Sequence, residues 1–191
     1  MPRPKYRQND ETARGKLVRA FWEAIADIPL HKLTVTKVIK RAGLNRNSFY
    51  YHFTCIEDMA EKVVEETLMR DLPGILVSEL NKGEGVAVDT LLSEKGIRER
   101  FDHVCLLAGK NSSPQLQEML KTAIAYNWKN YLSIESEKLS HEDRLVFEFC
   151  LGGVISLLAL RADADASPPI RDMFSTDFGK TALTAITKLG K

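Results

Sequence analysis

Apolar residues recur at helical spacing along almost the whole of this chain. Between residues 13 and 28, for example, they return every three or four positions, which places them on one face of an α-helix. No segment shows the two-residue alternation of a half-buried strand, and no internal repeat is visible. The pattern predicts an all-α fold.

Capping and helix-breaking residues divide this pattern into separate helices. Pro29 ends the first helix, Thr34 and Asn45 are predicted to cap a second and a third, and Gly43 breaks the chain between them. Similar signals predict further helices over about 55–72, 97–107, 114–138, 141–162 (opened by a capping box of Ser140 with Asp143) and 168–190, with a loop at 81–85.

The composition is that of a soluble globular protein. Hydrophobic residues make up 44% and charged residues 28% of the 191 positions. This hydrophobic content is enough to form a core without stabilising disulfides or metals. The three Cys are an odd number without a CxxC, so we expect no disulfide framework, no metal site and no cofactor. The longest apolar run, residues 150–160, is about half of a membrane span. We therefore expect a cytoplasmic protein without a membrane partner.

Charge is distributed unevenly along the chain. Residues 1–54 contain 11 Lys and Arg against 4 Asp and Glu, a net charge of +7, whereas residues 55–191 contain 16 against 22, a net charge of −6. A basic head on an acidic body is typical of a polyanion binder whose other end has a different task. The alternative, that this charge asymmetry arose by chance, is not excluded by the charge distribution alone.

Residues 34–53 carry the most specific signal. Two short predicted helices joined by a tight turn that contains Gly indicate a helix-turn-helix. Apolar residues are predicted to hold this pair against the first helix: Val38, Ile39, Ala42, Leu44, Phe49 and Phe53. The outward-facing residues all donate hydrogen bonds and none is acidic, which suits contacts with phosphates and base edges: Thr36, Lys37, Arg46, Asn47, Ser48, Tyr50, Tyr51 and His52.

This stretch resembles the DNA-binding domain of the TetR family of repressors. The resemblance is carried by the run Arg46-Asn47-Ser48-Phe49-Tyr50-Tyr51-His52-Phe53, which follows Ala42-Gly43-Leu44 and precedes Glu57-Asp58-Met59. It implies a helix-turn-helix domain over 1–55 and a larger helical domain for effector binding and dimerisation over 56–191. It also implies a transcriptional regulator that a small-molecule effector releases from a palindromic double-stranded DNA operator.

The resemblance also implies roles for single residues. Thr36 and Lys37 would contact phosphates, whereas Arg46 and Asn47 would reach base edges. Phosphates or sugars on either side of the groove would be held by Ser48, Tyr50, Tyr51 and His52. The chain departs from the family at Ile56, where a Lys is frequent, and this puts a phosphate contact at the start of the fourth helix in doubt.

The helix predicted over 142–162 is apolar on two nearly opposite stripes. One stripe holds Phe147, Leu151, Val154 and Leu158, and the other holds Phe149, Gly153, Ser156 and Leu160. Such a helix is buried on both sides, either as the centre of a monomer or against a second copy. With the last helix it is predicted to form a homodimer interface that includes Leu151, Val154, Leu158, Phe174, Phe178 and Ile186.

A ligand pocket in the body is implied by the resemblance alone. Its candidate lining residues are Phe101, His103, Cys105, Tyr126, Trp128, Tyr131, Glu148 and Phe149. Each of these aromatic residues can equally be core, and Glu148 can equally form an ion pair. Redox sensing by Cys105 or Cys150 is a further alternative, although neither has a basic neighbour in the sequence that would activate its thiol.

No sequence motif of an enzyme is present. The chain lacks a P-loop, a dinucleotide fingerprint, a nucleophile elbow and a zinc-protease motif. We therefore predict that it is not an enzyme. The alternative to a regulator is a helical ligand-binding or interaction protein whose degenerate helix-turn-helix does not bind DNA. That alternative rests on Ile56 and on the near-neutral net charge of +1.

Overall fold

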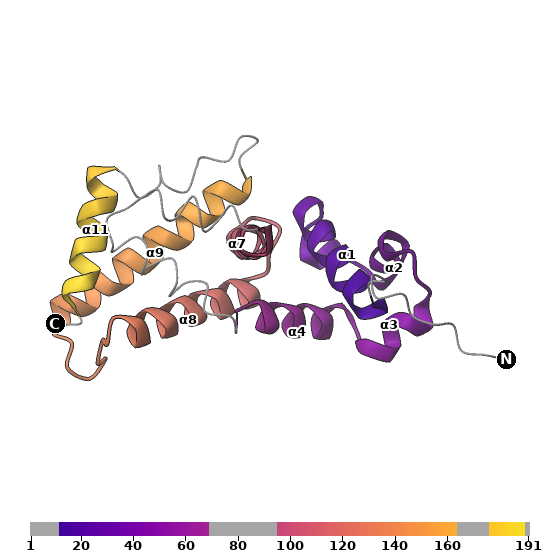
Figure 1. Ribbon diagram of the computed structural model, residues 1–191, viewed down its shortest axis with the longest axis horizontal. Coiled ribbons are helices and arrows are strands. Elements are labelled where there is room, and N and C mark those ends of the chain that lie inside the picture. The colour runs from indigo at the N-terminus through magenta and orange to yellow at the C-terminus, as the bar shows by residue number, and fades with distance from the viewer. Residues whose placement is uncertain (1–11, 69–94, 164–175, 190–191) are drawn as a thin grey trace. The chain divides into compact units, whose positions relative to one another are not determined.

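A computed structural model describes residues 12–68, 95–163 and 176–189 of the chain (Figure 1). All regular elements in these ranges are helices, which confirms the predicted all-α class. The chain divides into two compact units, Met1–Val63 and Val64–Lys191. The division falls inside the fourth helix.

The first unit is built from α1 and three shorter elements that follow it. These are α1 (Ala13–Asp27), the 3₁₀ turn η1 (Leu30–Lys32), α2 (Val35–Ala42) and α3 (Arg46–His52), before α4 (Ile56–Leu68) begins. Both predicted caps are confirmed, because the side chains of Thr34 and Asn45 accept hydrogen bonds from the backbone N–H of Lys37 and Ser48. Each cap satisfies an N–H that the first helical turn leaves without a partner.

The core side chains of the first unit are almost completely buried. α1 packs against α2 and α3, and α2 packs against α3. Among the most buried side chains of this unit are Leu17, Phe21, Ile25, Val38, Phe49, Phe53, Met59 and Val63. Truncating a buried Phe of this kind costs about 3–5 kcal/mol, so α3 is held firmly from its inner side.

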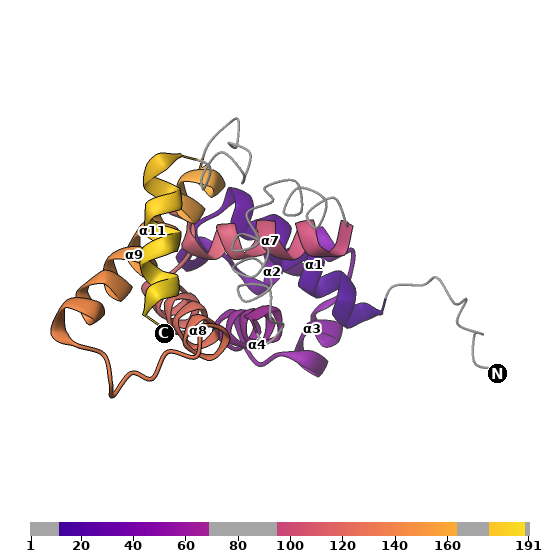
Figure 2. The same cartoon turned by 60° about the vertical axis from the view of Figure 1, so that its left-hand side comes forward.

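The second unit contains four described helices. They are α7 (Lys95–Ala108), α8 (Pro114–Tyr131), α9 (His141–Asp163) and α11 (Asp177–Lys188). α9 packs against each of the other three, and the views in Figures 1 and 2 show α11 crossing beside it. The capping box predicted before α9 is confirmed, because Ser140 and Asp143 exchange side-chain to backbone hydrogen bonds of 3.1 and 3.2 Å.

The predicted helix over 114–138 is too long. α8 ends at Tyr131, and Ser133 follows in the left-handed region with a φ of 55°. The N–H of Ile134 then bonds the carbonyl of Lys129 at 2.8 Å, which closes the helix with a Schellman motif, and the Ile134 side chain is buried. In the sequence, Ser at this position does not indicate the end of a helix, because the left-handed residue that ends a helix is usually Gly.

α9 is the described helix with the length and composition of a membrane span, with a mean hydropathy of 1.9. One such helix is weak evidence, because core helices of soluble proteins also meet these criteria. Several sequence predictions lie outside the described residues: the end of the helix over 55–72, the loop at 81–85 and the start of the helix over 168–190.

Candidate nucleic-acid interface

The turn between α2 and α3 is fixed by its backbone geometry. Gly43 has a φ of 66°, a left-handed conformation that side chains disfavour. The N–H of Leu44 bonds the carbonyl of Ile39 at 2.9 Å, so the end of α2 is closed before Asn45 starts α3. Only three residues therefore separate the two helices, and their mutual orientation is set locally.

One side of α3 is buried and the other faces solvent. Phe49 and Phe53 are 0% and 1% exposed, whereas Tyr50 and Tyr51 are 54% and 84% exposed. Arg46 and Asn47 share the exposed side, and Ser48 and His52 are half-buried at its margins. The structure thus brings the residues predicted on α3 to a common outer surface, next to the exposed Thr36 and Lys37 of α2.

Several of these side chains have partners within the unit. The Lys37 ammonium donates to the backbone carbonyl of Lys32 at 2.9 Å, and the Arg46 guanidinium donates to the Thr36 hydroxyl at 3.3 Å. The Ser48 hydroxyl bonds the Asn45 side chain at 3.1 Å. The rings of Tyr51 and His52 meet edge to face, with 4.9 Å between their centroids. These contacts reduce the freedom of the outer surface before any ligand arrives.

The electrostatics of this surface favour an anion. No Asp or Glu occurs between Asp27 and Glu57, while the same stretch carries exposed basic residues: His31, Lys32, Lys37, Lys40, Arg41 and Arg46. Of the acids that bound the stretch, Asp27 is paired with Arg41 at 3.1 Å. A surface with exposed cations and without carboxylates favours binding of a phosphate backbone.

The start of α4 differs from what the resemblance implies. Ile56 is buried, so its side chain contributes to the core in place of a solvent-facing Lys. Asp58 accepts from the N–H of Thr54 at 2.8 Å and pairs with Lys62 at 2.8 Å. The hydrogen bond from Lys62, followed by that from Thr54, lowers the pKa of Asp58. The N-terminus of α4 is thus occupied by a carboxylate of its own chain.

The first unit therefore has the architecture of a helix-turn-helix domain, the class in which the second helix presents its outer face to DNA. The model of the family described as bacterial regulatory proteins, tetR family, matches residues 17–63, about a quarter of the chain. The match supports a DNA-binding transcriptional regulator whose helix-turn-helix domain is similar to that family. No curated protein and no solved structure matches the chain.

The predicted ligand-lining residues of the body divide into buried and exposed side chains. Phe101, Cys105 and Trp128 are buried in the core, and His103 is partly buried. The others are exposed: Tyr126, Tyr131, Glu148 and Phe149. Glu148 forms an ion pair with Lys121 at 3.1 Å, which is the structural role left open above.

A charged cluster between α7 and α9 was missed by the sequence analysis. The guanidinium of Arg161 lies 5.5 Å from the centroid of the Phe101 ring and 3.4 Å from the Asp102 carboxylate. Burial raises the pKa of the neighbouring Cys105 thiol to about 12 and also raises that of Cys150. Both thiols stay protonated at neutral pH, which disfavours redox sensing by either. In sequence, Arg161 is only a basic residue in the last turn of an apolar helix.

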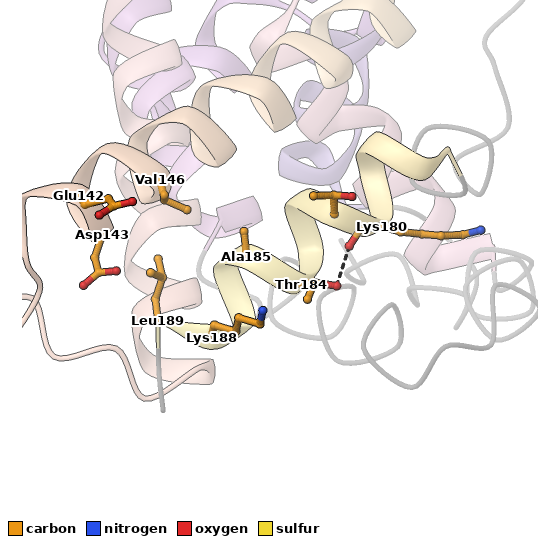
Figure 3. Close-up of a pocket in the computed structure, with 9 residues that line it drawn as sticks. Glu142, Asp143, Val146, Lys180, Thr184, Ala185, Lys188 and Leu189 are labelled. Atoms are coloured by element: carbon orange, nitrogen blue, oxygen red, sulfur yellow. Dashed lines mark hydrogen bonds between the residues drawn. The ribbon is translucent and has the colours of Figure 1, made fainter.

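A groove of about 450 Å³ opens between the first turns of α9 and the length of α11 (Figure 3). Glu142, Asp143 and Val146 line it from α9. α11 and its C-cap Leu189 line the other side, with Lys180, Thr181, Thr184, Ala185 and Lys188 from the helix itself. The Thr184 hydroxyl already donates to the carbonyl of Lys180 at 2.8 Å, as Figure 3 shows. The groove contains none of the predicted ligand residues.

The predicted dimer residues lie mostly inside the protomer. Leu151, Leu158 and Ile186 are 1%, 6% and 2% exposed, and Val154 is half-buried. The side chains of Phe174 and Phe178 lie outside the described residues. The exposed apolar stripe of α9 is instead formed by Leu145, Phe149 and Leu160, with Gly152, Gly153 and Ser156 between them. This is the second of the two stripes that the sequence predicted.

Proposed function

We propose that this regulator represses transcription by binding a near-palindromic operator as a homodimer, and that a small-molecule effector releases it. The observation that carries the proposal is the outer face of α3. Arg46, Asn47, Tyr50 and Tyr51 are exposed there together, on a helix held from behind by buried Phe49. Arg and Asn are the side chains that read guanine and adenine, and Tyr hydroxyls donate to phosphates.

The eight residues predicted on α2 and α3 divide into two proposed roles. Arg46 and Asn47, at the start of the recognition helix, read base edges in the major groove. The remaining six hold the phosphate backbone: Thr36, Lys37, Ser48, Tyr50, Tyr51 and His52. The phosphate contacts carry no sequence information, so removing one should weaken binding to all duplexes equally. Removing a base contact should instead change the preference for one base pair.

The proposed homodimer rests on the exposed stripe of α9. Leu145, Phe149 and Leu160 are 59%, 67% and 59% exposed, so the helix leaves a large apolar surface in solvent. Gly152 and Gly153 lie on this stripe and have open space around them, which lets a second helix approach closely. A two-fold dimer would place two recognition helices about 34–36 Å apart, in successive major grooves.

The proposed release by an effector follows the usual thermodynamics of a two-state switch. Suppose that the body binds the effector more tightly in a state whose recognition helices do not fit the operator. The effector then increases the population of that state and reduces the population that binds DNA. We place this regulator in the cytoplasm, where its operator and a diffusible effector meet.

Duplex binding across a salt series tests the DNA-binding part of the proposal. The intact protein should prefer one palindrome over random duplexes, and its affinity should fall steeply with salt because phosphate contacts release counterions. Asn47→Ala should relax the preference at one base pair by about 1–3 kcal/mol. Tyr51→Ala should weaken all duplexes by about the same factor.

Tyr126→Ala is the matched control for Tyr51→Ala. Tyr126 is also an exposed Tyr, at 66%, and lies on α8 of the other unit. Its removal should leave duplex binding unchanged. If the intact protein binds no duplex even at low ionic strength, the proposed regulatory function is wrong. The alternative function, a helical ligand-binding protein with a degenerate helix-turn-helix, would then be favoured.

A further inference from the structure

A side-chain hydrogen bond joins the two helices of the helix-turn-helix. Nη2 of Arg46 lies 3.3 Å from Oγ1 of Thr36, although ten positions separate the two residues in the chain. Arg46 is the first residue of α3 and Thr36 the second residue of α2. Both are exposed, so the bond lies on the outer surface that is proposed to meet DNA.

The chemistry of this pair allows both residues to bind DNA while they bind each other. A guanidinium has five N–H donors, and a single bond to Thr36 leaves enough of them to reach O6 and N7 of a guanine. The Thr36 oxygen accepts from Arg46, which leaves its own hydrogen free to point at a phosphate. One hydroxyl can therefore connect the phosphate backbone to the side chain that reads a base.

The neutrality of the partner matters. A carboxylate at position 36 would hold the guanidinium more tightly, but it would cancel the positive charge and repel the phosphates. No acid occurs between Asp27 and Glu57, so no carboxylate of this stretch pairs with Arg46 while the Thr36 hydroxyl limits its rotamers. A long side chain that is ordered before binding loses less conformational entropy when the complex forms.

We propose that Thr36 is a positioning residue that orients Arg46 for reading a guanine, beyond any contact of its own with phosphate. The inference rests on the proposed function, because it assumes that Arg46 faces a base. The backbone supports it: the three-residue turn closed by Gly43 fixes α2 against α3, so Thr36 stays at hydrogen-bond distance from Arg46. Thr36 then determines specificity without touching the base.

The test compares Thr36→Val with Thr36→Ser, each in the wild-type and the Arg46→Ala background. Val has nearly the shape of Thr without the acceptor, whereas Ser keeps the oxygen. Binding is measured to the preferred duplex and to duplexes with single base-pair changes. We expect Thr36→Val to reduce discrimination about fivefold at the one base pair whose preference Arg46→Ala abolishes. Thr36→Ser should retain discrimination within about twofold.

The Arg46→Ala background separates positioning from phosphate contact. There, Thr36→Val should change discrimination at no base pair, while any loss of its phosphate bond persists equally on all duplexes. If Thr36→Val in the wild-type background weakens all duplexes by one factor and leaves every preference intact, Thr36 is a phosphate contact alone and the inference is overturned. Unchanged binding of both Thr36 variants overturns it as well.

A second readout works without DNA. In the full-length protein, ¹⁵N relaxation of the Arg46 Nε should show a side chain that becomes more mobile in Thr36→Val but not in Thr36→Ser. Equal mobility in all three proteins would overturn the inference even if duplex binding is strong. Conversely, a restrained Arg46 in a protein that binds no duplex would overturn the proposed function, and the inference with it. The two failures are therefore distinguishable.

Discussion

Arg41, near the end of α2, donates hydrogen bonds from both of its Nη atoms to Asp27, the last residue of α1. Each Nη lies 3.1 Å from the same carboxylate oxygen, and Nη1 also donates to the backbone carbonyl of Glu23. This fork joins the ends of two helices that also pack against each other. Because α3 follows α2 after a three-residue turn, the fork also fixes α3 relative to α1.

Replacing Arg41 with Met should therefore act on stability and on DNA binding together. The Met side chain preserves the apolar stem but removes three charge-assisted contacts. We expect the unfolding free energy to fall by about 1 kcal/mol, because the pair is only partly shielded from solvent. Affinity for all duplexes should fall without a change in base preference. Denaturant titration and duplex binding measure the two effects.

Arg19→Met is the matched control within α1. The ion pair of Arg19 with Glu23 is longer, at 3.7 Å, and both side chains are more than half exposed. Its loss should change the unfolding free energy by only a few tenths of a kcal/mol. Equal losses for the two Arg variants would show that the fork on Asp27 has no special role.

Gly43→Ala should destabilise the first unit by about 1 kcal/mol or somewhat more. A Cβ at this position would meet no atom within 4 Å, so the cost comes from the positive φ alone. Gly43→Asn should cost less, since Asn tolerates the left-handed region better. Gly96→Ala is the control, because Gly96 is helical and also has open space around it. If Gly43→Ala costs no more than Gly96→Ala, the turn does not require its left-handed conformation.

The sequence predicted the helix-turn-helix well because its signals are local. The caps at Thr34 and Asn45 and the breaker at Gly43 act within four residues of where they stand. Helical periodicity then placed Phe49 inside and Arg46 outside. By contrast, the end of α8 depends on Ser133 in a left-handed conformation that Gly would normally signal, so the sequence extended that helix too far.

The body could not be predicted to the same depth, because its residues are placed by tertiary packing. Periodicity showed two apolar stripes on α9, and the stripe with Leu151 was predicted to form the dimer interface. Packing against α7, α8 and α11 buries the stripe with Leu151 and leaves the stripe with Phe149 exposed. The pairing of Arg161 with Asp102 joins residues 59 positions apart and has no local signal.

The exposed stripe of α9 gives a direct test of the homodimer. Phe149→Ser removes a side chain that is 67% exposed, so the protomer should keep its melting temperature within about 2 °C. Sedimentation at micromolar concentration should shift from dimer toward monomer, since aromatic anchors dominate interface energies. Tyr126→Ser, at 66% exposure on α8, should leave the dimer intact. An unaltered dimer in Phe149→Ser would exclude this stripe as the interface.

Gly153 should separate helix stability from dimerisation. An added Cβ meets nothing within 4 Å in the protomer, and Ala is the better helix former by about 1 kcal/mol. Gly153→Ala should therefore stabilise the monomer, while Gly153→Leu should block close approach of a second α9. We expect a weaker dimer for Leu than for Ala in sedimentation equilibrium. Equal dimer affinity of both variants would contradict a close helix crossing at this position.

Burial lowers the pKa of His103, in α7, from its ordinary value of 6.5 to about 4. Between these two values the unfolded chain binds a proton that the folded chain does not. Stability from the neutral ring is therefore present above pH 6.5 and is lost as the pH falls toward 4. The shift corresponds to at most about 3 kcal/mol, and the partial hydration of the ring reduces this to roughly 1–2 kcal/mol.

His103→Gln removes the titrating ring and should flatten this part of the stability profile. We expect the unfolding free energy of the wild type to drop more than that of the variant between pH 6.5 and pH 4, as measured by urea titration at several pH values. His141→Gln is the control, because His141 is exposed at the start of α9 and its ring stays in solvent in both states. A wild-type profile parallel to that of His103→Gln would show that the His103 ring takes up its proton in the folded protein as readily as in the unfolded chain.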